Sequence, residues 1–213
     1  HQSPVTGKEI VFVNNRMEDF NIKSPSFSQD YNLNYSGGND KGHYYAGLGY
    51  NKSEGNAIGN YNRRLSFLLN VDYKIKSWLT TISKFNFSTT KYKGISPFTG
   101  EENYFSRNFS YPPTFRAYNN NGEMILGKNS GDGNQQFLAN AWDNDENRQK
   151  FMFSQDFKIK PFEDLTINFK GDWFYEFYNF ERFYRTYQTA PGQFNRSHNS
   201  SAQTQRNLTQ TYN

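Results

Sequence analysis

The chain of 213 residues contains no cysteine, which excludes disulfide scaffolds, thiolate metal sites and cysteine nucleophiles. It also has no apolar run near the roughly 18 residues of a spanning helix, so any passage through a membrane requires strands. Its only histidines, His1, His43 and His198, are isolated in the sequence. Serine-hydrolase, zinc-protease and phosphate-loop motifs are missing as well. The sequence therefore predicts a protein that is not an enzyme and that carries no cofactor.

Hydrophobic residues are scarce too, at 34% of the chain, and the mean hydropathy is -0.98. Disordered chains share this property, but they are poor in aromatic residues, whereas Phe, Tyr and Trp make up 19% here. A transmembrane barrel reconciles the two facts, because its lumen and loops are polar and aromatic residues lie at both interfaces. The 24 basic residues are scattered among 20 acidic ones without a long basic run. We therefore expect no nucleic-acid partner.

What the chain does contain is a two-residue alternation of apolar and polar side chains. Over residues 61–73, one phase carries Leu65, Phe67, Leu69 and Val71, and the other carries Ser66, Asn70 and Asp72. We expect the first set to face lipid and the second to face a lumen. Segments of this kind are about 10 to 13 residues long, which suits a tilted membrane strand better than a soluble strand of about 5 or 6.

Six such strands are predicted, and no segment shows a convincing helical period. They cover residues 27–36, 43–52, 61–73, 78–90, 148–160 and 165–178. The first, third and fifth connections are shorter than the others, so tight turns gather at one end and large loops at the other. Six strands cannot close a channel, for which about eight are the minimum. The chain is therefore expected to form part of a larger sheet.

Several stretches resemble SusC/RagA-like TonB-dependent outer-membrane transporters. Residues 30–50, closing with Glu54 and Gly55, resemble the first complete barrel hairpin of that family, and the likeness continues through residues 63–67 and the turn at 76–79. Tyr111-Pro112-Pro113 and residues 118–123 resemble parts of its large external loop.

The resemblance implies an all-β, antiparallel up-and-down transmembrane barrel of about 22 strands in a bacterial outer membrane, of which this chain is an early segment. Residues 1–26 would end the first external loop, 27–90 would form four strands, 91–147 a long external loop, 148–178 two strands and 179–213 the start of the next loop. The plug domain and TonB box of the family would lie outside the chain.

The function that the resemblance implies is active import of oligosaccharides or peptides. Its partners would be outer-membrane lipids, a SusD-like lid lipoprotein, TonB acting through the N-terminal part, and the cargo. The alternative is a soluble or surface-attached β-sandwich that binds a ligand. Such a module would stay monodisperse without detergent.

The loop at 91–147 is the candidate functional site, because loops above about 12 to 15 residues are commonly functional or disordered. Its aromatic content argues against disorder, and Asn120-Asn121-Gly122 can close a small hairpin of its own. The alternative is that the loop only packs over its own rim. The candidates for contact with cargo or lid are Tyr104, Phe105, Tyr111, Phe115, Tyr118 and Trp142.

Two other stretches have simpler interpretations. Residues 142–147 are rich in oxygen donors, but they lack the glycine and the distant glutamate of a calcium loop, so no metal site is predicted. The aromatic residues between Trp173 and Tyr184 could stack on sugars or bases, but we interpret them as an interfacial girdle. Trp78 has the same interpretation at the inner turn.

Overall fold

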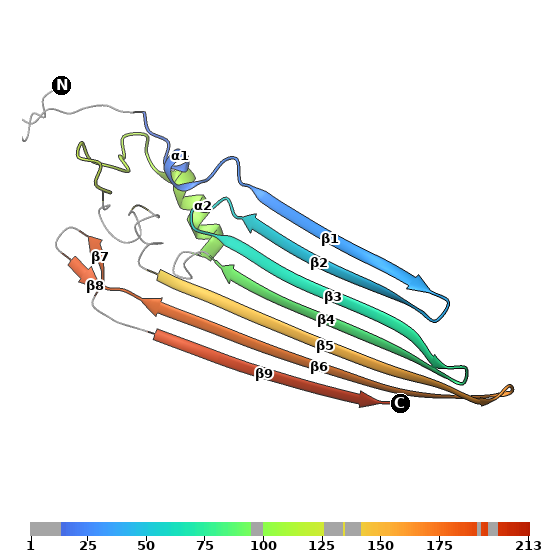
Figure 1. Cartoon of the computed structure of the whole chain (residues 1–213). Coiled ribbons are helices and arrows are strands. Elements are labelled where there is room, and N and C mark those ends of the chain that lie inside the picture. The colour runs from blue at the N-terminus through green and yellow to red at the C-terminus, as the bar shows by residue number, and fades with distance from the viewer. Residues whose placement is uncertain (1–13, 95–99, 126–133, 135–141, 191–192, 196–199) are drawn as a thin grey trace, which may run out of the picture.

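A computed structural model describes residues 14–94, 100–125, 134, 142–190, 193–195 and 200–213. The described residues form one antiparallel sheet of seven strands in the order β1-β2-β3-β4-β5-β6-β9 (Figure 1). Its strands are β1 (Ser28–Asn39), β2 (Gly42–Glu54), β3 (Tyr61–Lys76), β4 (Leu79–Lys93), β5 (Trp142–Phe162), β6 (Leu165–Tyr184) and β9 (Ser200–Tyr212). Each strand pairs with its predecessor in this order, which confirms the predicted up-and-down topology.

The smaller elements lie at the end of the sheet opposite the tight turns (Figure 1). They are α1 (Glu18–Asn21), α2 (Gly100–Ser110) and the paired short strands β7 (Tyr187–Ala190) and β8 (Gln193–Asn195). No helix among the described residues is both long and apolar enough to span a membrane.

All six predicted strands exist, and each is longer than the alternation indicated. The structure adds β9, so the assignment of 179–213 to a loop is wrong for Ser200–Tyr212. Polar side chains occupy most positions on both faces of β9, and its aliphatic residues are Ala202 and Leu208. Because both phases of the strand are polar, no alternation marks it. Its backbone nevertheless pairs with β6 from Gly171 to Phe183.

The expectation of no helix is also wrong, because α2 lies within the predicted loop. Among the α2 side chains that the structure describes, the buried ones are Tyr104 and Asn108, one turn apart. A spacing of four residues puts these two side chains on one helical face. Because one is an amide and the other a phenol, they do not form the apolar stripe by which a helix is predicted from sequence. The loop is also shorter than predicted, since β4 extends to Lys93 and β5 begins at Trp142.

The predicted sorting of connections is confirmed. The three tight turns, between Asn39 and Gly42, Lys76 and Leu79, and Phe162 and Leu165, lie at one end of the sheet (Figure 1). In the first turn, the side-chain oxygen of Asn39 accepts hydrogen bonds from the backbone nitrogens of Lys41 at 2.9 Å and Gly42 at 3.2 Å. An Asn side chain that bonds the backbone two residues on stabilises such a turn locally.

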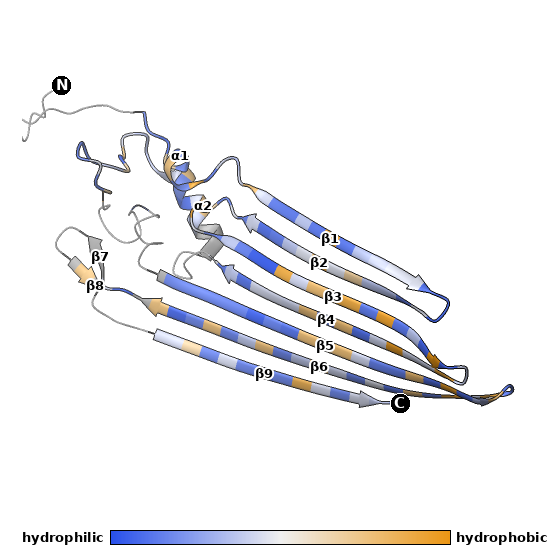
Figure 2. Ribbon diagram, viewed as in Figure 1, coloured by the Kyte–Doolittle hydropathy of each residue, from blue (hydrophilic) through white to orange (hydrophobic). Residues whose placement is uncertain are grey.

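The register divides the sheet into two faces and puts the two phases of β3 on opposite sides, as predicted. Figure 2 shows the hydrophobic and hydrophilic positions that follow one another along β3. On the apolar face, the Phe85 ring contacts Phe67 at 5.7 Å and Phe151 at 5.0 Å between ring centroids. We call the side that carries the following residues the apolar face: Leu65, Phe67, Leu69, Val71, Phe85, Phe87, Phe151, Phe153, Trp173 and Tyr175. The opposite side is the polar face, which carries Ser66, Asn70, Asp72, Lys84, Ser88, Lys150, Asp172 and Glu176.

Gln155 interrupts the apolar face together with its β4 neighbours Ser83 and Thr81. Gln155 accepts a hydrogen bond from the Ser83 hydroxyl at 2.7 Å and donates one to the Thr81 hydroxyl. Without water, a polar group must find its partners within the protein. The interruption is therefore satisfied by its own neighbours in β4.

The girdle interpretation can apply only to alternate aromatic residues in β6, because these alone share the apolar face. Trp173, Tyr175 and Phe177 share the apolar face, where Trp173 stacks on Phe153 at 5.4 Å. Phe174, Tyr178 and Phe180 belong to the other phase of the strand and lie on the polar face. A contiguous aromatic run in an extended strand is necessarily shared between two faces. The single girdle predicted for this run is therefore wrong for half of it.

Candidate functional site

Three segments pack together at the large-loop end of the sheet into a unit that we call the loop cluster. It consists of residues 14–23 before β1, residues 55–60 between β2 and β3, and residues 100–125 with Asn134 between β4 and β5. Its buried apolar side chains are Met17, Ala57, Tyr104 and Ala117, each with at most 2% of its surface exposed. They come from a segment before β1, from the β2–β3 connection and from the β4–β5 connection. The cluster is thus a small core of its own.

Hydrogen bonds at the centre of the loop cluster join α1 to α2. The Asn21 amide nitrogen donates to the Asn108 side-chain oxygen at 2.6 Å. The Asn108 amide donates in turn to the Tyr104 carbonyl at 2.7 Å, and the Tyr104 hydroxyl donates to the Asn21 carbonyl at 2.6 Å. Burial of the phenol raises the pKa of Tyr104 to about 12.

Backbone contacts connect the remaining parts of the loop cluster. The backbone nitrogen of Lys23 donates to the Asn56 carbonyl at 2.6 Å, and the backbone nitrogen of Asn15 donates to the Pro113 carbonyl at 2.9 Å. Ala117 uses its carbonyl twice, accepting from the Ile125 nitrogen at 2.8 Å and from the Asn134 amide at 3.3 Å. Three segments distant in sequence are thereby held in one arrangement.

The predicted small hairpin is present within the loop cluster. Tyr118 and Met124 form an antiparallel bridge, and the Asn119 nitrogen donates to the Glu123 carbonyl at 2.8 Å. Gly122 has a φ of +79°, a left-handed conformation that glycine adopts without strain. The hairpin residues Asn120, Asn121, Gly122 and Glu123 are exposed.

The six candidate aromatic residues have different environments. Tyr104 is only 1% exposed, so its proposed contact with cargo or lid is wrong, and its role is in the core of the loop cluster. Phe105 is half-buried and meets the Tyr104 ring edge-on at 5.6 Å. Tyr111 stacks on Phe115 at 4.9 Å.

Tyr118 lies 5.9 Å from the ring of Phe20, so it is half-buried against the segment before β1. Trp142 begins β5 opposite Tyr184, and its side chain lies outside the described residues. The most exposed aromatic side chain of α2 is Phe109, at 65%. It was not among the six candidates.

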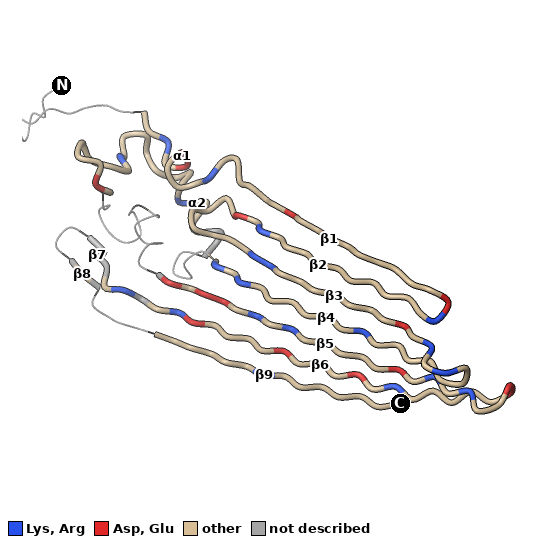
Figure 3. The backbone as a smooth tube through the Cα atoms, in the orientation of Figure 1, with Lys and Arg blue, Asp and Glu red and all other residues tan. Residues whose placement is uncertain are grey.

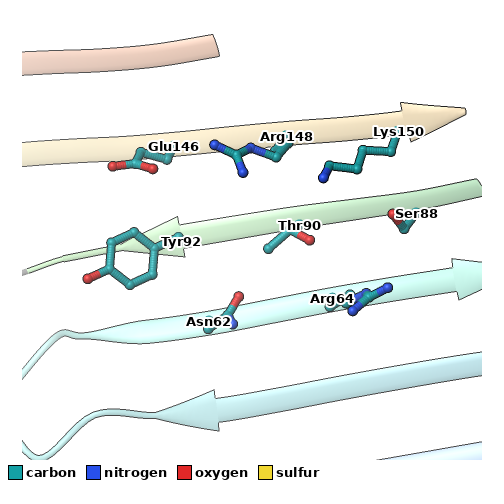
Figure 4. A pocket seen from close by; sticks show the side chains of 8 residues that line it. All are labelled: Asn62, Arg64, Ser88, Thr90, Tyr92, Glu146, Arg148 and Lys150. Carbon is teal, nitrogen blue, oxygen red and sulfur yellow. The ribbon is translucent and has the colours of Figure 1, made fainter. Parts of the chain in front are cut away.

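A second site, on the polar face, was not predicted. A hollow of about 350 Å³ lies where β3, β4 and β5 run side by side, near their large-loop ends (Figure 4). Its lining residues are Asn62, Arg64, Ser88, Thr90, Tyr92, Glu146, Arg148 and Lys150. All of them occupy the same phase of the register. Because they are far apart in sequence, only the strand pairing could have revealed this hollow.

Charges of both signs follow β5 and β6 beside this hollow (Figure 3). Glu176 lies 3.7 Å from the guanidinium of Arg148 and 3.5 Å from the ammonium of Lys150. The Arg148 guanidinium also lies over the Tyr178 ring, 5.1 Å from its centroid. Within the described part of the chain, the Arg64 side chain forms no ion pair or hydrogen bond, whereas its backbone pairs with β2 and β4.

The acidic stretch at 142–147 belongs to β5 and not to the long external loop predicted for residues 91–147. Its carboxylates alternate between the two faces, with Asp143 and Asp145 in one phase and Glu146 in the other. Among the residues that the structure describes, no three His, Asp or Glu side chains gather as metal ligands would.

Comparison with known structures relates the fold to peptide importers. The RagAB peptide importer in its "open-open" state matches with a TM-score of 0.75 at 15% identity, over 97% of this chain and 24% of the matched chain. The "closed-closed" state matches with a TM-score of 0.68 at 17% identity, over 87% of this chain and 22% of the matched chain. A structure of the RagAB peptide transporter matches with a TM-score of 0.72 at 15% identity, over 98% of this chain and 24% of the matched chain.

At these identities the likeness is one of fold, and it confirms the resemblance to a SusC/RagA-like barrel at that level. The chain spans about a quarter of the length of the matched chains. No protein-family model matches the sequence, and no curated protein does.

Proposed function

We propose that the chain is part of the wall and outer loops of a TonB-dependent importer in a bacterial outer membrane. The observation that carries this proposal is a sheet of long antiparallel strands with one apolar and one polar face and with its large loops at one end. Transmembrane barrels combine these features. The likeness of fold to the RagAB importer supports the same function.

Exposure of the apolar face argues against the alternative of a soluble sandwich. Leu33 is 69% exposed and Leu208 65% exposed, and aromatic residues between them remain accessible on the same face. A sandwich buries such a face against a second sheet. Lipid would cover it in a barrel.

Peptides are the cargo we favour over oligosaccharides, because the matched structures are of peptide importers. The polar face would line the lumen, and the loop cluster would lie outside the cell, where a lid lipoprotein could contact it. Energy would be supplied by TonB. The barrel wall contributes position and shape and performs no chemistry.

The test is membrane residence together with uptake. We expect the protein to fractionate with outer membranes and to require detergent for monodispersity. Cells that produce it should take up short peptides only when TonB is functional, and cells lacking TonB are the control. A protein that stays monodisperse in plain buffer would refute the membrane assignment. Uptake independent of TonB would refute active import.

A further inference from the structure

We propose that Arg64, Arg148 and Lys150 form a binding site for a side-chain carboxylate of an acidic cargo peptide. This inference rests on the proposed function, because it requires the polar face to be the lumenal wall. It adds a location and a chemical preference, namely a hollow on β3, β4 and β5 that selects anionic peptides (Figure 4).

The strand register brings the three cations around two hydroxyl groups. Arg64 lies directly opposite Thr90, and Thr90 lies directly opposite Arg148. Lys150 lies opposite Ser88 on the same face. Neighbouring strands are about 4.8 Å apart, so the backbones of the two arginines are about 10 Å apart. Side chains of this length can reach a common ligand above Ser88 and Thr90.

The charges in the hollow leave an excess of positive charge. Glu176 is the single carboxylate within 4 Å of both Arg148 and Lys150 in the described structure, and its side chain is 18% exposed. The side chains of Arg148 and Lys150 remain 51% and 47% exposed. Glu176 therefore holds the two cations from one side and leaves them accessible from the lumen.

Arg64 makes the imbalance larger, because within the described residues it has no acidic partner. With Glu146 and Glu176 counted against the three cations, the site retains one net positive charge. An anionic ligand would neutralise that charge. Water screens the interaction, so we expect it to weaken with salt.

A carboxylate matches the donors that the hollow offers. A guanidinium presents paired N–H groups that fit the two oxygens of a carboxylate, and hydroxyl groups can donate further bonds. Asn62 adds an amide that can both donate and accept, as a peptide group requires. These features favour an acidic peptide over a neutral one.

The experiment compares two peptides binding to the intact purified protein in detergent. One is an acetylated and amidated tetrapeptide with two aspartates, and the other carries asparagines in their place. We expect the aspartate peptide to bind about tenfold more tightly at low salt, which corresponds to one charge-assisted contact. Arg64→Gln should remove most of this preference, and Arg64→Glu should abolish it.

The matched control is Lys158→Gln, which removes a cation from the same face of β5. Its position is about 26 Å along the strand from Lys150, at about 3.3 Å per residue. This variant should keep the preference. Equal affinity of the two peptides for the unaltered protein, no binding of either, or an equal loss in Lys158→Gln would each overturn the proposal.

Two further measurements separate this inference from its alternatives. The first is the binding of trigalacturonate to the same purified protein. If it binds more tightly than the aspartate peptide, and if Arg64→Gln weakens its binding, the site is one for an acidic glycan and the peptide assignment is overturned. Uptake of the asparagine peptide by cells tests the importer function alone. If uptake fails while the preference persists in detergent, the site stands and the importer function does not.

Discussion

Asn21 and Asn108 lie 87 residues apart in the sequence and share a buried hydrogen bond of 2.6 Å between their side-chain amides. Neither residue has more than 1% of its surface exposed. The bond joins the segment before β1 to α2, so two outer connections depend on each other for their conformation. The large-loop end of the sheet is therefore a folded unit and not a set of independent loops.

Replacing Asn108 with alanine should loosen the loop cluster. The Asn21 amide would lose its acceptor, and the side-chain oxygen of Asn21 already has no hydrogen-bond partner among the described residues. A buried polar group left unpaired costs about 1 to 3 kcal/mol. Hydrogen exchange should accelerate in α1 and α2 and stay unchanged in β3. Asn121→Ala, at an exposed hairpin position, is the control, and equal protection in both variants would contradict the prediction.

A second prediction concerns pH. Burial raises the pKa of Tyr104 to about 12, whereas an unfolded tyrosine titrates near about 10. The neutral phenol therefore stabilises the loop cluster fully below about pH 10, and this contribution is lost as the pH rises from about 10 to 12. The difference in tyrosinate absorbance between the unaltered protein and Tyr104→Phe should titrate near pH 12. A difference that titrates near pH 10 would mean that the hydroxyl reaches water.

The two faces of β3 should tolerate a charge very differently. Phe67 contacts Phe85 on the apolar face, and Asn70 lies three residues farther along on the polar face. Phe67→Arg should lower the free energy of unfolding from the membrane by about 2 to 4 kcal/mol if residue 67 lies near the bilayer midplane. Asn70→Arg should cost less than about 1 kcal/mol, mostly from repulsion by Lys84 directly opposite. Folding into lipid vesicles in a urea series measures both, and equal costs would refute the barrel assignment.

The sequence predicts β3 well because its two phases differ in chemistry, with Leu65 and Phe67 in one and Ser66 and Asn70 in the other. It does not predict β9, where Thr204 and Gln205 fall on opposite faces and are both polar. Backbone pairing with β6 forms that strand, and a single sequence carries no direct sign of pairing. Strand prediction from alternation therefore fails where both faces are polar.

The candidate site was only partly predictable for a similar reason. Aromatic content marks the loop that contains Tyr111 and Phe115, and the two rings do stack on each other. Aromatic content does not distinguish a buried ring from an accessible one, so Tyr104 was misassigned. The basic hollow depends on Arg64 and Arg148, which are 84 positions apart in the numbering. Only the pairing of β3, β4 and β5 brings them together.

The exposed hairpin of the loop cluster offers a test of whether the cluster contacts cargo or a lid protein. Replacing residues 119–123 with Gly-Ser removes the exposed tip and leaves the buried Ala117 in place. The barrel should still fold, because no residue of the tip lies in the sheet. Uptake or lid association should fall about tenfold if the tip supplies one contact worth about 1.4 kcal/mol.

A matched change at the opposite end of the sheet controls for general damage to the protein. Asp40→Asn with Lys41→Gly alters the tight turn between β1 and β2 and keeps a turn-forming sequence there. This variant should retain uptake and lid association, because it lies a full strand length from the loop cluster. If the shortened hairpin also retains both, while hydrogen exchange shows the cluster intact, the outer loops serve only to pack over their own rim. Loss of both activities in the shortened hairpin alone would assign the contact surface to the tip.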